Sequence, residues 1–160
     1  MKAGSDEAGP NTVVRPPLLY GLGTVIGLGL DSVLPLPFSF GVDDSVRYVT
    51  AAAIGVAALS LAATAFLQFR RAGTNVPTWQ PSLALVTDGL YAHSRNPIYI
   101  ALNLLYLSIA VATGSSWMLA LLLPALLVLQ FGVILREEAY LEEKFGQSYR
   151  DYKQKVRRWL

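Results

Sequence analysis

Long apolar runs separated by short polar segments dominate the chain. They cover about residues 17–34, 48–69, 97–113 and 117–135. Each run is much longer than the ~4–8 residues of a buried strand, which favours helices. A helix needs ~20 apolar residues to cross the ~30 Å hydrocarbon core of a bilayer. The pattern therefore predicts an all-α integral membrane protein with about four transmembrane helices.

The polar segments indicate how the chain is organised. Residues 1–12 are polar and without periodicity, and we interpret them as a mobile tail before one membrane domain, 13–160. The tail lacks the apolar stretch of a cleaved signal peptide. Only GSS separates the third and fourth runs, which predicts a tight helical hairpin. The 70–96 segment is long for a loop in a compact domain, and such loops often carry function.

The distribution of charge predicts the orientation in the membrane. Every Lys and Arg except Arg47 lies before the first run, in the 70–96 segment or after the fourth run. Positively charged loops stay on the cytoplasmic side, so both termini and the 70–96 loop are expected there. The net charge is only +2, which argues against a nucleic-acid partner and leaves the lipid bilayer as the expected one.

Two residue types limit the chemistry. The chain has no cysteine and a single histidine, His93. This excludes a disulfide scaffold, a thiolate nucleophile and a metal site built from cysteines or several histidines. We expect no metal.

Small residues gather on the first two runs. Gly23 and Gly27 form a GxxxG motif, and alanines occupy much of the second run. Small residues let membrane helices approach closely. Two interpretations follow: packing of helices inside one molecule, and a homodimer that forms through this face.

The start of the third run combines capping residues with polar chemistry. Asn96 suits an N-cap, and Pro97 suits the first helical position. A helix start also presents free N–H groups and positive potential to a carboxylate or phosphate, and Arg95 adds a cation. Two interpretations of this segment therefore fit the sequence: helix capping alone, and the binding of a ligand. The neighbouring aromatic residues are Tyr91 and Tyr99.

Charged residues end the fourth run. Arg136, Glu137 and Glu138 follow its last apolar residues. Carboxylates at the C-terminal end of a helix oppose its macrodipole. Either the helix continues beyond the membrane, or the acids have a function.

The C-terminal segment is amphipathic. Apolar residues at 141, 145, 149, 152, 156 and 159 share one helical face, and basic residues lie opposite. We expect cytoplasmic helices over 137–159, with Gly146 ending the first and Ser148 with Asp151 capping the next. An interfacial helix on anionic lipid and a lid over a cytoplasmic pocket both fit this pattern.

Three motifs resemble the isoprenylcysteine carboxyl methyltransferase family, within a wider group that includes phospholipid methyltransferases. They are G-x-Y-x-x-x-R-N-P-x-Y (89–99), the E-E pair (137–138) and F-G-x-x-Y-x-x-Y-x-x-x-V-x-R-W (145–159). The resemblance covers about residues 70–160. It implies a membrane methyltransferase that binds S-adenosylmethionine on the cytoplasmic side and takes a lipophilic substrate from the bilayer. Carboxyl O-methylation of an isoprenylcysteine-like molecule is the expected reaction.

The resemblance also suggests roles for residues. Arg136 and Glu138 are the expected catalytic residues, with Arg136 holding an acidic substrate or aligning the acids. Asn96 replaces the histidine of the family's R-H-P-x-Y motif, and His93 does not fill that position. This departure points to a bacterial-type branch and a prokaryotic cell membrane. The expected cofactor-binding residues are Tyr91, His93, Arg95, Asn96, Pro97, Tyr99, Glu137, Glu138 and Tyr149.

Other functions remain open from the sequence. A phospholipid amine N-methyltransferase has the same fold. A membrane C=C reductase that uses NADPH carries a similar R-H-P-x-Y motif and tail. An assembly subunit that has lost activity is the non-enzymatic alternative.

Overall fold

The computed structural model describes residues 9–36, 43–75 and 80–160. These ranges hold helices and no strand, which confirms the predicted all-α fold. Helix η1 is a 3₁₀-helix and η2 is a π-helix. The elements are α1 (Pro16–Val33), α2 (Asp44–Arg71), η1 (Gly89–Ala92), α3 (Pro97–Thr113), α4 (Ser116–Leu129), η2 (Gln130–Ile134), α5 (Leu135–Phe145) and α6 (Gln147–Lys155).

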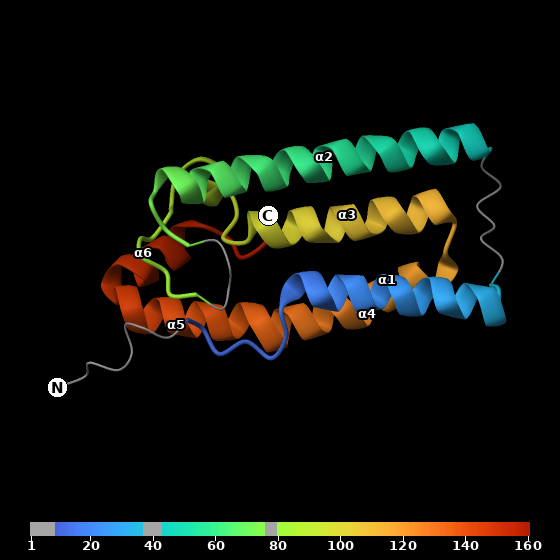
Figure 1. The fold of residues 1–160 in the computed structure, drawn as a ribbon. Helices are drawn as coiled ribbons and strands as arrows, with labels where there is room; N and C mark the ends of the chain where they lie inside the picture. The colour runs from blue at the N-terminus through green and yellow to red at the C-terminus, as the bar shows by residue number, and fades with distance from the viewer. Residues whose placement is uncertain (1–8, 37–42, 76–79) are drawn as a thin grey trace.

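The long helices lie side by side along one direction (Figure 1). Helix α2 packs on α3, and α1 packs on α4. Helix α5 continues the line of α4, and α6 lies at the same end of the molecule as η1 and the start of α3 (Figure 1). Polar segments from distant parts of the sequence therefore meet at one end of the helices.

The helix that contains the fourth apolar run is longer than the run. Helices α4, η2 and α5 form one helix over Ser116–Phe145, so the helix continues past residue 135, one of the two alternatives for the charged residues. This helix and α2 are long and apolar enough to cross a bilayer, whereas α3 is shorter. Its 30 residues exceed the ~20 that the hydrocarbon core requires. Its charged residues, including the two glutamates, lie in α5, at the C-terminal end of this helix.

The turn of the predicted hairpin has its own capping residues. Gly114 ends α3 with a φ of 65°, in the left-handed region that favours glycine. The hydroxyl of Ser115 then accepts a hydrogen bond from the backbone N–H of Met118 at 3.0 Å and caps α4. The tight turn between α3 and α4 is confirmed.

Of two predicted N-caps, one is confirmed in position and the other is wrong. Asn96 is the N-cap residue of α3 and Pro97 its first helical residue, as predicted, but the Asn96 side chain makes no cap hydrogen bond. Helix α6 begins at Gln147, so Ser148 lies inside the helix and does not cap it. Instead, the Gln147 amide donates to Asp151 at 2.6 Å. Gly146, with a φ of 57°, separates α5 from α6 as predicted.

The amphipathic pattern also extends beyond the last helix. Helix α6 ends at Lys155, and Val156 has an extended backbone. We call residues 156–160 the C-terminal strap. Its apolar residues keep the spacing of the α6 face, although the strap itself is not helical.

The GxxxG face packs inside the molecule. Gly23 lies against Tyr106 of α3, and Gly27 lies against Met118 of α4. A Cβ on Gly27 would come 2.5 Å from Cγ of Met118. This geometry supports the interpretation that the small residues bring helices of one chain together.

The outer faces of the long helices are strongly apolar. Large apolar side chains that are exposed in a water-soluble protein are usually few and scattered. In this protein the large exposed apolar side chains run along the outer faces of the long helices. A bilayer would cover these side chains. Examples are Leu22, Val25, Val49, Val56, Leu59, Leu123 and Leu127.

The chain around the end of the predicted tail is attached to the π-helix and to α5. The N–H of Val13 donates to the carbonyl of Gly132 at 2.9 Å. Arg136 donates from Nη1 to the carbonyl of Asn11 at 3.2 Å. Residues 1–8 of the tail lie outside the described residues.

Candidate active site

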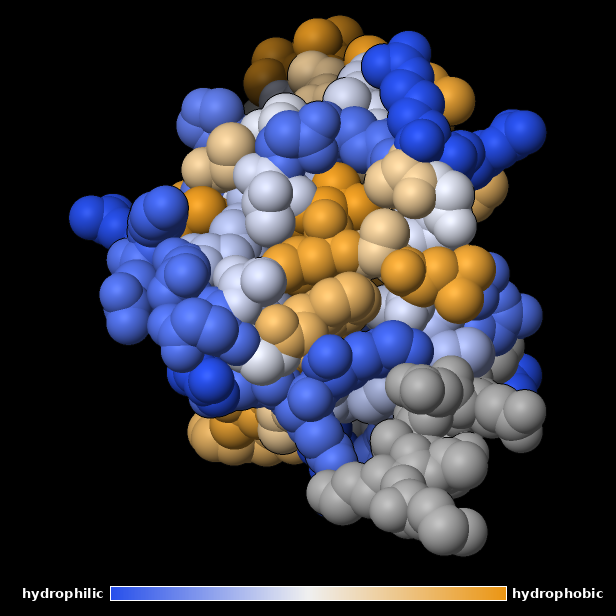
Figure 2. Space-filling view, turned by 90° about the vertical axis from the view of Figure 1, so that its left-hand side faces the viewer, coloured by the Kyte–Doolittle hydropathy of each residue, from blue (hydrophilic) through white to orange (hydrophobic). Residues whose placement is uncertain are grey.

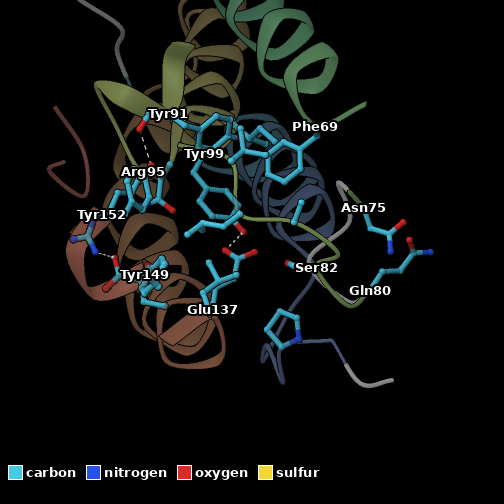
Figure 3. A pocket seen from close by; sticks show the side chains of 18 residues that line it. Phe69, Asn75, Gln80, Ser82, Tyr91, Arg95, Tyr99, Glu137, Tyr149 and Tyr152 are labelled. Atoms are coloured by element: carbon cyan, nitrogen blue, oxygen red, sulfur yellow. Dashed lines mark hydrogen bonds and ion pairs between the residues drawn. The ribbon is translucent and has the colours of Figure 1, made fainter. Parts of the chain in front are cut away.

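A cavity of about 100 Å³ lies at the polar end of the helices, where the loop before η1 meets α3, α5 and α6. Figure 2 shows this end of the molecule as a largely hydrophilic surface around a hydrophobic centre. Figure 3 shows the cavity, with Tyr99 and Glu137 facing each other and Arg95 on the side opposite Asn75 and Gln80. The polar lining residues include Asn75, Gln80, Ser82, Arg95, Asn96, Glu137 and Glu138, and the aromatic ones Phe69, Tyr91, Tyr99, Tyr149 and Tyr152.

The loop that forms one wall is fixed by hydrogen bonds from its polar residues. The hydroxyl of Thr74 accepts from the backbone N–H groups of Leu83 and Ala84, at 2.8 and 3.2 Å. The N–H of Ser82 donates to the hydroxyl of Tyr140 on α5 at 3.1 Å. These contacts place the described part of the loop against the cavity.

Glu138 is buried between two arginines. Arg158 donates from Nε and Nη2 to its two carboxylate oxygens at 2.8 and 2.9 Å. Nη1 of Arg95 lies 3.1 Å from Oε1 of the same carboxylate. A bidentate pair of hydrogen bonds from one guanidinium to one carboxylate is a strong and directional contact. The charge of Glu138 is therefore already compensated within the protein.

Glu137 is in a different position, although it is the next residue. The hydroxyl of Tyr99 donates to its Oε2 at 2.7 Å. Among the described residues it has no ion pair with a Lys or Arg. Burial raises the pKa of Glu137 to about 7, the Tyr99 hydrogen bond opposes this, and the charge of Glu138 adds to it. Glu137 is thus a carboxylate in the cavity wall that lacks a cation.

Arg95 supplies the opposite charge. Its side chain is only 9% exposed. Its Nε is buried and has no hydrogen-bond acceptor among the described residues, and its Nη1 faces Glu138 without hydrogen-bond geometry. A buried guanidinium with unsatisfied donors is costly unless an acceptor fills the place. Arg95 therefore points to an anion in this cavity.

The C-terminal strap is bonded to residues that line the cavity. The side-chain amide of Asn96 donates to the carbonyl of Arg158 at 2.9 Å. The backbone N–H of Arg95 donates to the carbonyl of Arg157 at 3.0 Å. Nε1 of Trp159 donates to Oε1 of Gln130 at 3.2 Å. The strap is thus attached to the start of α3 and to the π-helix.

Aromatic residues form the rest of the wall. Tyr149 is 1% exposed, and burial raises its pKa to about 12, so it stays a neutral hydroxyl. The hydroxyl of Tyr152 donates to the carbonyl of Tyr91 at 2.6 Å, which joins α6 to η1. The rings of Phe69 and Tyr91 meet edge to face with centroids 5.1 Å apart. The cavity is therefore enclosed by rings as well as charges.

The structure brings most of the residues expected at a cofactor site to this cavity. His93 is exposed, and its Nδ1 lies 3.0 Å from the carbonyl of Gly89. Pro97 is buried at the start of α3 and is not part of the lining. Arg136 is exposed and bonded to Asn11, so it neither lines the cavity nor aligns the acids. The expected residues that do line it are Tyr91, Arg95, Asn96, Tyr99, Glu137, Glu138 and Tyr149.

Sequence reasoning assigned no role to two residues that shape the site. Arg158 holds Glu138, and Tyr152 joins α6 to η1. Both residues belong to the C-terminal motif on which the family resemblance rests. The motif therefore marks them, but it does not indicate their individual roles. Residues of the loop wall such as Ser82 gave no signal, because their contribution depends on tertiary contacts.

Comparison with known proteins gives a family. Residues 46–148 match the phospholipid methyltransferase family. Over 65 residues, 39% of this chain, the sequence is 49% identical to the full length of an uncharacterized protein of Haemophilus influenzae. Over 74 residues, 45% of this chain, it is 39% identical to protein-S-isoprenylcysteine O-methyltransferase of Schizosaccharomyces pombe, and that match spans 30% of the yeast protein. No solved structure matches.

The matched region contains nearly all of α2, all of α3, α4 and α5, and most of the cavity wall. It also includes two of the three motifs from which the resemblance was drawn, and the start of the third. The chain therefore belongs to the phospholipid methyltransferase family of membrane-associated methyltransferases, the wider group that its motifs had indicated.

Proposed function

We propose that the protein is an integral membrane methyltransferase that uses S-adenosylmethionine and acts on a lipophilic or amphiphilic acceptor. Membership of the methyltransferase family supports the reaction class. One observation carries the proposal furthest: in the cavity, Nε of the Arg95 guanidinium has no acceptor among the described residues, and the Glu137 carboxylate has no ion pair with a Lys or Arg among them.

The donor set fits this cofactor. S-adenosylmethionine carries a carboxylate, an ammonium and a sulfonium. The free Nε of Arg95 suits the carboxylate, and Glu137 together with the tyrosine rings suits a positive charge. The cavity of about 100 Å³ is smaller than the ~300–1,000 Å³ of most small-molecule sites. The walls must therefore separate for a ligand to bind.

The residues of the chain would position the reactants and exclude water. The bound cofactor supplies an electrophilic methyl group. Methyl transfer to a carboxylate depends mainly on orientation and needs no base. Arg95 and Glu137 fix the charged ends of the ligands, and the strap with Tyr149 and Tyr152 shields the site from solvent.

The acceptor group has two candidates. Carboxyl O-methylation of an isoprenylcysteine-like molecule agrees with the function of the yeast relative. A phospholipid amine is the second candidate, and the raised pKa of Glu137 supports it. A carboxylate with a pKa of about 7 can accept the proton that an ammonium group must lose before it becomes a nucleophile.

The proposal includes a membrane topology. Four spans, formed by α1, α2, α3 and α4 with η2, would place both termini and the cavity on the cytoplasmic side of a prokaryotic cell membrane. The apolar outer faces of the helices and the Lys and Arg distribution support this arrangement.

Ligand-induced stabilisation tests the proposal. In detergent, S-adenosylhomocysteine should raise the melting temperature of the purified protein, and NADPH should not. Stabilisation by NADPH alone would favour the reductase, and stabilisation by neither ligand would favour an assembly subunit. The Glu137→Gln variant should lose most of the effect. Glu143→Gln, a matched change at an exposed residue of α5, should keep it.

A further inference from the structure

The chain segment before α1 crosses the helix that carries the two glutamates. The N–H of Val13 donates to the carbonyl of Gly132 in η2 at 2.9 Å. Two residues earlier in the chain, the carbonyl of Asn11 accepts from Nη1 of Arg136 in α5 at 3.2 Å. Figure 1 shows this segment, in blue, beside the line of α4 and α5. We call residues 10–13 the N-terminal clip.

The clip is bonded on both sides of the end of the π-turn. Gly132 lies within the π-turn, whereas Arg136 belongs to the regular helix that follows it. The place of a π-turn along a helix decides which way the following side chains face. Because the clip holds one residue before this junction and one after it, the clip favours a single rotation of α5 relative to η2.

The clip is also packed onto the π-turn. Gly132 has no side chain, which lets the clip approach the helix backbone closely. A Cβ on Gly132 would lie 3.4 Å from Cβ of Val13, already in van der Waals contact. The next residue, Val14, packs against the core cluster that includes Val133 and Ile134. The hydrogen bond from Val13 is therefore supported by apolar contacts beside it.

The clip reaches the cavity itself. Pro10 is buried and lines the cavity together with Glu137. Glu137 directly follows Arg136, which forms no ion pair with either glutamate among the described residues. Arg136 thus fastens the clip and does not contact the acids. The family match begins at residue 46, so this part of the cavity wall comes from outside the matched region.

We propose that the N-terminal clip is a positioning element of the site, which holds the π-turn in place and keeps the Glu137 carboxylate turned into the cavity. The clip acts through the helix and does not touch the reacting atoms. Its bonds to both sides of the junction and the place of Pro10 in the cavity wall support this role. The inference rests on the proposed function only where it treats Glu137 as a ligand-binding group.

The ionisation of Glu137 reports its position without any ligand. Burial raises the pKa of Glu137 to about 7, and the ionisable groups that face it are Tyr91, Tyr99, Tyr149 and the neighbouring Glu138. A folded-state pKa above the usual value makes the protein less stable at about pH 8 than at about pH 5. Glu137→Gln removes this part of the difference in melting temperature and so identifies it.

Deletion of the clip tests the proposal. The test variant lacks residues 2–13, and the matched control lacks only residues 2–8, which leaves the clip in place. Melting temperatures are measured in detergent at about pH 5 and about pH 8, with and without Glu137→Gln. We expect the control to keep the Glu137-dependent difference and the test variant to lose at least half of it. Stabilisation by S-adenosylhomocysteine should also fall by at least half in the test variant.

Single substitutions replace the deletion if the shortened protein does not fold. Val13→Pro removes the N–H that is bonded to Gly132. Arg136→Gln weakens the hold on Asn11, and Arg136→Lys, which keeps a cationic donor, should restore the wild-type behaviour. Arg71→Gln removes an exposed arginine at the end of α2 and serves as the matched control.

A purely structural clip gives a different result. Loss of the clip would then lower the melting temperature equally at both pH values and leave the Glu137-dependent difference unchanged, which overturns the proposal. A wild-type protein without any Glu137-dependent difference also overturns it. A difference that depends on the clip, in a protein that S-adenosylhomocysteine does not stabilise, would support the clip and reject the proposed function. Stabilisation by S-adenosylhomocysteine with a difference that does not depend on the clip would do the reverse.

Discussion

The side-chain amide of Asn96 donates a hydrogen bond of 2.9 Å to the carbonyl of Arg158, so the first turn of α3 holds the end of the chain. The hydroxyl of Ser94 lies 3.4 Å from the same carbonyl. The residue that replaces the histidine of the R-H-P-x-Y motif therefore acts on the strap, which in turn carries Arg158 to Glu138.

Replacing this amide should loosen the strap. Asn96→Asp removes the donor and places a carboxylate opposite the Arg158 carbonyl, which should lower stability by ~1–3 kcal/mol, the cost of an unsatisfied buried group. Thermal unfolding in detergent measures it. Gln154→Glu, an amide-to-acid change at an exposed residue of α6, should have little effect. Equal effects of the two changes would show that Asn96 does not hold the strap.

Removing the strap should affect ligand binding more than folding. A chain that ends after Lys155 keeps α6 but loses Arg158 and Trp159. We expect normal membrane insertion and at least ~tenfold weaker binding of S-adenosylhomocysteine in calorimetry, because Glu138 loses its two-pronged partner. Lys155→Gln is the control for the loss of a nearby basic side chain. If the shortened protein bound S-adenosylhomocysteine with unchanged affinity, the strap would have no role in ligand binding and would serve only as an anchor.

Glu137 should make binding depend on pH. Its folded-state pKa of about 7 lies above its usual 4.5, so the contribution to stability is present below pH 4.5 and lost as pH rises through about 7. Binding of a cationic ligand should change in the opposite direction, because the ionised carboxylate attracts it. From about pH 6 to about pH 8, affinity for S-adenosylmethionine should rise roughly tenfold. In Glu137→Gln both trends should disappear, as titration calorimetry and melting curves at each pH would reveal.

The membrane orientation can be measured with single cysteines, since the natural chain has none. Ser115 is buried and caps α4, so it is a poor site for a label. Thr113, exposed at the end of α3, is better. In intact cells, Thr113→Cys should react with a membrane-impermeant maleimide, and Lys155→Cys should react only after lysis. The opposite pattern would place the cavity outside the cell.

Packing through Gly27 can be separated from a dimer interface. Gly27→Ala puts a Cβ against Met118, with 3.1 Å to its backbone nitrogen, and should cost ~1–3 kcal/mol. Gly21→Ala has nothing within 4 Å and should be neutral or stabilising by up to ~1 kcal/mol. Both melting temperatures should be independent of protein concentration. A concentration-dependent loss in Gly27→Ala would instead indicate a homodimer.

The long elements could be predicted because each apolar run has few alternatives in a bilayer. Backbone groups without water must pair within the segment, so runs such as 97–113 become helices. The caps were less predictable. Asn96 and Ser148 have local patterns typical of N-caps, but Asn96 finds its partner 62 residues away, and α6 starts one residue earlier than its pattern suggests.

The sequence predicted the site residues whose motifs lie at the same end of the fold. It did not predict on which side of its helix a charged side chain lies. Arg136 is adjacent in sequence to the two glutamates. Residues two apart on a helix point about 200° from each other, so Arg136 faces away from Glu138. The arginines that do reach Glu138, Arg95 and Arg158, come from the start of α3 and from the strap. Only the tertiary fold brings them there.

The π-helix at Gln130–Ile134 sets the rotation of everything that follows it. A π-turn contains one residue more than an α-turn, so it shifts the phase of α5 relative to α4 by about 100°. Deleting a single residue here would restore a regular α-helix, and the residues that remain would still be mostly apolar. It would also turn Glu137 and Glu138 away from the cavity. Conservative apolar substitutions at the buried Val133 and Ile134 should thus be tolerated better than changes in the length of this stretch, which makes residue count itself a requirement of the site.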